Sequence, residues 1–206
     1  MIKAFNEGKD IHLSTASKIY NIPEDGVTRQ QRSNAKTVNF GIIYGVSAFG
    51  LSQQTDLNRI ESKEMIDTYY KSYPKLKEYM SSQIQFAREN GFVSTLLKRR
   101  RYLKDINSQN AIVRGAAERT AINAPIQGSA ADIIKLAMIR IDKKIYEEKL
   151  QSRMILQVHD ELVFDVPKEE KNILSNIVKI EMENALELEV PLVVDLGMGN
   201  NWLEAH

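Results

Sequence analysis

The sequence predicts an α+β fold, a helix-rich chain with an antiparallel β-hairpin in its C-terminal part. Long helix-forming stretches lie between turn signals such as Tyr73-Pro74 and Asn90-Gly91. Near the C-terminus, apolar residues instead alternate with a period of two on both sides of His159–Glu161, which is typical of two strands joined by a short turn. The chain shows no internal repeats and no low-complexity linkers.

The first long helix is predicted from its two ends. Thr28 and Gln31 have the spacing of a capping box, and Tyr44-Gly45 is a stop signal about four turns later. Further helices are expected at about 62–72, 74–90, 108–123, 129–149 and 168–188, with a break at Ala124-Pro125. Strands are expected at 92–97 and 102–103, at 154–166 as a hairpin, and at 192–196.

Composition excludes several classes of protein. With 206 residues and 43% apolar content, the chain can bury a sizeable core, and without cysteine it holds neither disulfides nor thiolate metal sites. No run approaches the ~20 apolar residues that span a bilayer, and the N-terminus has no signal-peptide core. We therefore expect a soluble, cytoplasmic protein that does not bind membranes.

The net charge of +1 hides an uneven distribution along the chain. Residues 1–159 contain 25 Lys and Arg against 16 Asp and Glu, whereas residues 160–206 contain 3 against 11. A basic body with an acidic end suits a protein that binds a polyanion in one part and divalent cations in another, although solvated helix faces would give the same asymmetry.

Four side chains on the first long helix form a slanting stripe: Arg32, Lys36, Phe40 and Tyr44. Each step of four residues drifts by only about 40° around a helix. Two stacked cations repel each other, so a triphosphate is a natural partner for them, and the aromatic rings could then pack on a sugar and a base. For an arbitrary helix the favoured alternative is that the aromatic residues belong to the core and the cations are solvated.

The turn at His159–Glu161 places two adjacent carboxylates, Asp160 and Glu161, at the tip of the predicted hairpin. Asn-Gly or Asp-Gly would be the relaxed choice for such a turn, so ionisable residues there indicate a function such as metal binding. A solvated polar turn is the alternative, and it accounts for most isolated Asp-Glu pairs.

Three segments share a resemblance to one family: Arg32–Gly45, Arg119–Gly128 and Gln157–Glu161. Together they resemble family A DNA polymerases, the DNA polymerase I type. Arg32–Gly45 resembles the fingers helix of that family, Gln157–Glu161 its palm hairpin, and Arg119–Gly128 its primer-template contact segment. Their order and spacing also fit, and the resemblance extends from Asp10-Ile11-His12 to Asn201-Trp202-Leu203. It implies a helical fingers subdomain, mainly residues 1–110, and a C-terminal palm segment, residues 111–206.

The resemblance implies a role for each matching residue. His12, Arg32 and Lys36 would hold the triphosphate of a deoxynucleoside triphosphate, with Lys36 also the proton donor to pyrophosphate. Phe40 would pack on the sugar, and Tyr44 would occupy the templating-base position. The remaining implied contacts are with primer-template DNA and Mg²⁺: Arg119, Asn123 and Gln127 in the minor groove, Arg99, Arg100 and Arg101 on phosphates, His159 at the primer terminus, and Asp160 and Glu161 on the metal. Without the flanking motifs, the favoured interpretation of Arg119 and Asn123 would be a polar helix face, and that of Gln127 a helix-start residue after Pro125.

The chain also departs from the family pattern. The basic loop has Lys98 where the family usually has Gly, and Lys104 where it often has Pro. The upstream palm aspartate that completes the family's two-ion site is expected before the start of this chain, so a partner N-terminal polymerase fragment is implied and the chain alone is expected to be inactive. The alternatives are a noncatalytic nucleotide- or DNA-binding module and, least favoured, a structural protein.

Overall fold

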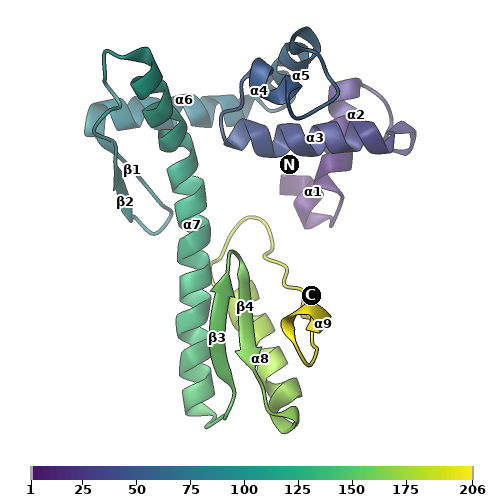
Figure 1. The fold of residues 1–206 in the computed structure, drawn as a ribbon, viewed down its shortest axis with the longest axis vertical. Helices are drawn as coiled ribbons and strands as arrows, with labels where there is room; N and C mark the ends of the chain where they lie inside the picture. The colour runs from purple at the N-terminus through teal and green to yellow at the C-terminus, as the bar shows by residue number, and fades with distance from the viewer. Residues whose placement is uncertain (1, 206) are drawn as a thin grey trace. The chain divides into compact units, whose positions relative to one another are not determined.

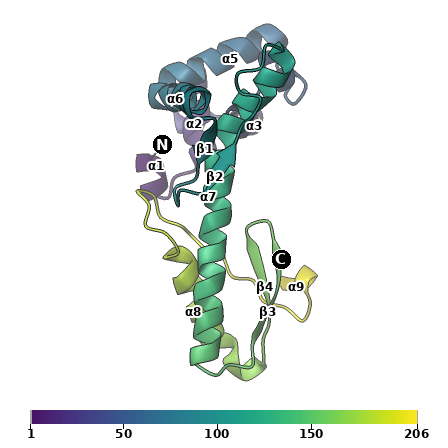
Figure 2. The same ribbon diagram turned by 90° about the vertical axis from the view of Figure 1, so that its left-hand side faces the viewer.

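The computed structural model describes residues 2–205 and divides into two compact units, Met1–Gln127 (unit 1) and Gly128–His206 (unit 2) (Figures 1 and 2). The elements confirm an α+β fold, because helices dominate and two small antiparallel sheets accompany them. In chain order they are α1 (Ile2–Asn6), α2 (Ile11–Tyr20), the 3₁₀ turn η1 (Glu24–Gly26), α3 (Arg29–Ile43), α4 (Ala48–Ser52), α5 (Arg59–Ser72), α6 (Pro74–Asn90), β1 (Phe92–Ser94), β2 (Arg100–Tyr102), α7 (Ala111–Glu147), β3 (Arg153–Val158), β4 (Glu161–Asp165), η2 (Lys168–Glu170), α8 (Lys171–Glu183) and α9 (Trp202–Ala205).

Unit 1 is built around two apolar clusters. The first joins α3 to α5 and α6, with Tyr69 and Met80 packed against the buried face of α3. The second joins the end of α6 and strand β1 to the N-terminal half of α7 through Ala87, Val93 and Ala121. Because α3 is anchored by the first cluster along one face, its other face is free to present side chains to a ligand.

Helices α5 and α6 show which local signals the sequence carried. Helix α6 begins at Pro74 and ends before Gly91, whose φ of +74° closes the helix as predicted. Helix α5 begins at Arg59, earlier than the predicted 62, because Asn58 and Glu61 form a capping box: the Asn58 side chain accepts from the Glu61 N–H, and the Glu61 carboxylate accepts from the Asn58 N–H.

The predicted break at Ala124-Pro125 is wrong, because α7 runs without interruption from Ala111 to Glu147 with Pro125 inside it. Proline removes one backbone donor and crowds the preceding turn at a local cost of about 3 kcal/mol. Packing on both sides offsets that cost: Ala121 and Ile122 are buried before the proline, and Ala137 and Ile141 are buried after it. The boundary between the two units, between Gln127 and Gly128, falls inside this helix.

Unit 2 packs the C-terminal half of α7, helix α8 and the β3–β4 hairpin around one core. Ile141 of α7 and Leu174 and Val178 of α8 form its centre, and Met154 and Phe164 of the hairpin pack against it. The predicted hairpin is confirmed, with Arg153 opposite Asp165 and Val158 opposite Glu161.

A register shift in the hairpin corrects the predicted alternation of its first strand. The shift lies between Met154 and Leu156, so Met154 packs on the core while Ile155 and Leu156 are 60% and 48% exposed. A bulge of this kind moves every later side chain of the strand to the other face, which a period-two pattern cannot indicate.

Two other predictions near the C-terminus differ from the structure. Helix α8 ends at Glu183 and not near 188, and Asn184 caps it with a side-chain amide that donates to Ile180 O at 2.8 Å. The predicted strand at 192–196 forms no ladder in the described chain, although exposure still alternates along Leu192, Val193 and Val194. Within residues 2–205, no helix has both the length and the apolarity that a membrane crossing requires.

Candidate functional site

Helix α3 carries the candidate site, and its sequence determines both of its ends. At the start, the Gln31 N–H donates to Thr28 Oγ1 at 3.2 Å and the Thr28 N–H donates to Gln31 Oε1 at 2.9 Å, which confirms the predicted capping box. At the end, Gly45 has a φ of +70°, its N–H donates to Ile42 O, and the Val46 N–H donates to Gly41 O at 2.8 Å. This pair of bonds is a Schellman motif, which ends the helix with Tyr44 at its C-cap.

The two faces of α3 differ sharply in exposure. Ala35, Val38 and Ile42 are essentially buried, whereas Phe40 and Tyr44 are 50% and 51% exposed. The alternative that these aromatic residues belong to the core is therefore wrong. Exposing half of two large aromatic rings to water is energetically unfavourable. Exposed apolar surfaces of this kind commonly bind a partner or a ligand.

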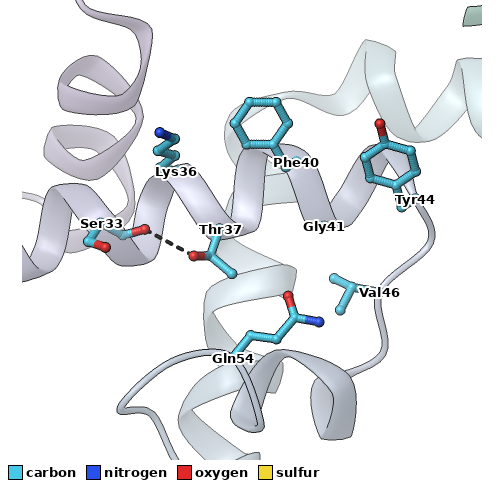
Figure 3. Close-up of a pocket in the computed structure, with 8 residues that line it drawn as sticks. All are labelled: Ser33, Lys36, Thr37, Phe40, Gly41, Tyr44, Val46 and Gln54. Carbon is cyan, nitrogen blue, oxygen red and sulfur yellow. Dashed lines mark hydrogen bonds between the residues drawn. The ribbon is translucent and has the colours of Figure 1, made fainter. Parts of the chain in front are cut away.

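A depression of about 500 Å³ lies along this part of α3 (Figure 3). Thr37 and Gly41 face Val46 and Gln54 across it, while Lys36, Phe40 and Tyr44 project from the same helix along its rim. Gly41 leaves room for Val46 there, because a Cβ at this position would lie 2.8 Å from Val46 Cγ1. The residues that line it are Ser33, Lys36, Thr37, Phe40, Gly41, Tyr44, Val46 and Gln54.

Helix α2 brings His12 beside this stripe. The His12 and Phe40 ring centroids are 5.7 Å apart and tilted by 43°. Burial lowers the pKa of His12 below its ordinary value; Asp10 acts against this shift, and the cations Arg32 and Lys36 reinforce it. His12, Arg32, Lys36 and Phe40, four of the residues singled out in the sequence, thus share one neighbourhood although they come from two helices.

Asp10 connects the two helices and was not assigned a role from sequence. Its Oδ1 accepts from the backbone N–H groups of His12 and Leu13 at 2.9 and 3.0 Å, as the N-cap of α2, and its Oδ2 accepts from Arg32 Nε at 2.7 Å. Partial burial acts to raise the pKa of Asp10, but these hydrogen bonds and the Arg32 charge together hold that pKa below its usual value. The N-cap position of Asp10, directly before an apolar residue and His12, was the signal available in the sequence.

The candidate minor-groove residues Arg119, Asn123 and Gln127 lie on the uninterrupted helix α7 at intervals of four, and therefore along one side of it. Gln127 is consequently not a helix-start residue, as one interpretation of the sequence held. The stem of Arg119 packs beside Gly45, where an added Cβ would lie 2.9 Å from Arg119 Cγ. Unit 1 thus places Arg119 next to the C-terminal end of α3.

The basic segment forms a second small hairpin, β1–β2, on which Arg99, Arg100 and Arg101 are all exposed. Its first strand ends at Ser94, before the predicted 97, because the turn begins at Thr95, whose N–H donates to Arg99 O at 2.9 Å. Its second strand begins at Arg100, before the predicted 102. Lys98 has a φ of +67°, a left-handed conformation that favours glycine. The Arg100 guanidinium lies 4.4 Å from the centre of the Phe92 ring, which holds one cation close to the sheet.

In unit 2, the β3–β4 turn presents His159 and Asp160 as exposed residues, and Glu161 begins strand β4. His159 has a φ of +55° at a position where glycine would be relaxed, and its carbonyl accepts from Gln157 Nε2 at 3.0 Å. Carboxylate oxygens are the donors that Mg²⁺ prefers, so Asp160 and Glu161 fit part of a magnesium site. Among residues 2–205 no three His, Asp or Glu side chains gather closely enough to hold a metal ion by themselves.

The helical first unit and the hairpin-bearing second unit can be compared with known proteins, and this comparison identifies the family. Residues 1–204 match the family described as DNA polymerase family A, so this chain belongs to that family. Members of the family generally use divalent metal ions.

Individual relatives agree with this family. The chain is 53% identical to a DNA polymerase I of Caldicellulosiruptor bescii over 99% of its own length, and 51% identical to one of Geobacillus stearothermophilus over 100%. It spans about a quarter of the length of these relatives, 24% and 23% respectively. A solved structure described as the POL domain of Pol1 from M. smegmatis, in complex with DNA primer-template and dNTP, superposes with a TM-score of 0.93 at 46% identity, covering 99% of this chain and 36% of that one.

Proposed function

We propose that this chain forms the nucleotide-binding and DNA-binding part of a DNA-directed DNA polymerase that acts in DNA replication or repair in the cytoplasm. The reaction is nucleotidyl transfer, in which the primer 3′-hydroxyl attacks the α-phosphate of a deoxynucleoside triphosphate and pyrophosphate leaves. The observation that carries the proposal is the exposed stripe of α3, whose cations and aromatic rings stand on a helix anchored by its opposite, buried face. Residues 1–110 are assigned mainly to the fingers and residues 111–206 to the palm.

The nucleotide contacts follow the stripe from its cationic to its aromatic end. Arg32, Lys36 and His12 bind the triphosphate, and Lys36 donates a proton to the departing pyrophosphate as charge develops on it. Phe40 packs on the sugar, and the exposed Tyr44 occupies the templating-base position until a matched pair displaces it. The half-exposed rings supply apolar contact area without being needed by the core.

The DNA contacts are independent of sequence. Arg119, Asn123 and Gln127 reach acceptor atoms that every Watson-Crick pair presents in the minor groove, so they test pairing and not base identity. Arg99, Arg100 and Arg101 bind phosphates. We expect the slope of the logarithm of the DNA-binding constant against the logarithm of salt concentration to decrease in magnitude by about one for each arginine removed.

The metal contacts rest on the β3–β4 turn. Asp160 and Glu161 hold Mg²⁺, and His159 positions the primer terminus beside them. Two bound ions would neutralise phosphate charge and favour the attacking 3′-oxygen, as two-metal sites do in polymerases. We propose that an N-terminal polymerase fragment contributes a further carboxylate, because among residues 2–205 no three His, Asp or Glu side chains gather closely enough to hold a metal ion.

Primer extension tests the proposal. The chain is assayed with Mg²⁺, deoxynucleotides and primer-template DNA, alone and mixed with the N-terminal fragment of a related family A polymerase. We expect extension only in the mixture, its loss in Asp160→Ala, and a strongly raised KM for deoxynucleotides in Lys36→Ala. Asp195→Ala and Lys63→Ala are matched controls, because both residues are exposed and lie away from the candidate residues in sequence.

Equal extension by the wild-type mixture and the Asp160→Ala mixture would refute the metal assignment. No extension in any mixture, with DNA binding intact and lost on replacing Arg99, Arg100 and Arg101, would instead identify a noncatalytic DNA-binding module.

A further inference from the structure

A buried polar network lies behind His12, on the side away from the exposed face of α3. Asn39 is 8% exposed, and its Nδ2 lies 3.0 Å from His12 Nδ1. Thr15, fully buried on α2, places its Oγ1 3.3 Å from Asn39 Oδ1, and Tyr73 OH lies 3.4 Å from the same Thr15 oxygen. None of these three residues belongs to the candidate stripe. Apolar side chains in their place would avoid the free-energy cost of burying polar groups, so packing alone does not explain the network.

The direction of the hydrogen bonds follows from the groups involved. The Tyr73 and Thr15 hydroxyls share a hydrogen bond, the Thr15 hydroxyl donates to Asn39 Oδ1, and the Asn39 amide N–H donates to His12 Nδ1. Thr15 Oγ1 is also 3.3 Å from Asn39 Nδ2, so the threonine contacts both ends of the amide and holds its plane. A ring nitrogen that accepts carries no proton, so the one proton of a neutral imidazole resides on the other nitrogen.

We propose that Asn39 is a positioning residue that holds His12 in the neutral form protonated at Nε2, so that His12 offers an N–H donor to the triphosphate. This inference rests on the proposed function only for the identity of the anion.

The surroundings explain why a neutral donor is useful here. Arg32 and Lys36 already supply two positive charges near His12, while Asp10 supplies a negative one. A third full charge in this group would repel the two cations, whereas a neutral N–H adds a directed hydrogen bond at no such cost. Burial also favours the neutral imidazole, in agreement with the lowered pKa of His12.

The experiment reads the protonated nitrogen directly. Long-range ¹H–¹⁵N NMR spectra of the full chain, labelled with ¹⁵N-histidine and assigned with His12→Gln, are recorded at a pH above the His12 titration. We expect an unprotonated Nδ1 and a protonated Nε2 in the wild type. Asn39→Asp should raise the pKa of His12 and move a proton to Nδ1, because a carboxylate only accepts. A wild-type His12 protonated at Nδ1 overturns the inference, and this result needs no variant to fold.

Asn34→Leu is the matched control for Asn39→Leu. Asn34 is also a buried asparagine of α3, but its Nδ2 donates to Asp56 and Tyr20 and makes no contact with His12. Asn39→Leu should alter the His12 spectrum, and Asn34→Leu should leave it unchanged. Equal changes in both variants would mean that packing, not the hydrogen bond, determines the state of His12.

Binding of inorganic tripolyphosphate separates this inference from the proposed function. We expect Asn39→Leu to weaken binding about fivefold, the value of one ordinary hydrogen bond, and to have no further effect in the His12→Gln background. Additive losses would show that Asn39 acts independently of His12 and would overturn the inference. A wild-type chain with the expected protonation but no affinity for tripolyphosphate would refute the triphosphate assignment alone.

Discussion

Replacing Gly41 with alanine is the sharpest test of how α3 ends. In an unobstructed helix, Gly→Ala stabilises by about 1 kcal/mol. At Gly41 the new Cβ would lie 2.8 Å from Val46 Cγ1 and 3.1 Å from Val46 Cβ, because the Schellman motif folds Val46 back over the last turn. Overpacking of this kind costs about 1–3 kcal/mol, so the loss should exceed the gain. We expect Gly41→Ala to lower the free energy of unfolding by about 1 kcal/mol.

Two further variants separate the clash from helix propensity. In a Val46→Ala background the 2.8 Å contact disappears and only the 3.1 Å contact remains, which a small shift can relieve, so Gly41→Ala should there be neutral or stabilising. Gly115→Ala is the matched control, since a Cβ within α7 would approach only Arg119 Nη1 at 3.8 Å; it should stabilise by about 1 kcal/mol. Urea unfolding followed by far-ultraviolet circular dichroism measures all four variants. Equal stabilisation by Gly41→Ala and Gly115→Ala would refute the close approach of Val46.

Three more predictions follow from backbone conformation and charge. Lys98→Gly removes a left-handed lysine with a φ of +67°, so it should stabilise by about 1 kcal/mol in urea unfolding while weakening DNA binding in a fluorescence anisotropy titration. His159→Gly, at a φ of +55°, should stabilise by a similar ~1 kcal/mol yet slow primer extension by the reconstituted polymerase; faster extension would contradict the role of His159. The pKa of Asp10 is lowered from 3.8 by folding, so its contribution is fully present above that pH and is lost as the pH falls through the folded pKa. The difference in stability between the wild type and Asp10→Asn should therefore be constant at neutral pH and shrink in acid; a difference that grows in acid would contradict the assignment.

Local signals made α3, α6 and the β3–β4 hairpin predictable from sequence. A capping box, a proline at a helix start, a glycine at a helix end and two apolar runs flanking a polar turn each act within a few residues, so they can be recognised without tertiary structure. The errors arose where distant packing decides. Pro125 lies inside α7 because Ala121 and Ile141 are buried on either side of it, and the 192–196 segment keeps its alternation but pairs with no strand in the described chain.

The candidate site divides in the same way. The stripe from Arg32 to Tyr44 follows from helical spacing alone, and the resemblance gave each member a role. Asp10 and Asn39 were not found, because their significance lies in contacts between α2 and α3, over separations of 22 and 27 residues to Arg32 and His12. A buried asparagine on an amphipathic helix is a weak signal by itself, since only the structure shows which group it faces.

Backbone strain offers a separate argument for where function lies. Among the described residues, four that are not glycine have a positive φ: Asn21, Lys98, Lys149 and His159. Asn21 caps the end of α2 and Lys149 follows the end of α7, where left-handed residues are common. The other two stand in the turns of the two β-hairpins, where glycine would relieve about 1 kcal/mol each. Strain at Lys98 and at His159 is expected if each turn is retained because its side chain contacts a ligand. Replacing either residue with glycine should therefore raise stability and lower activity.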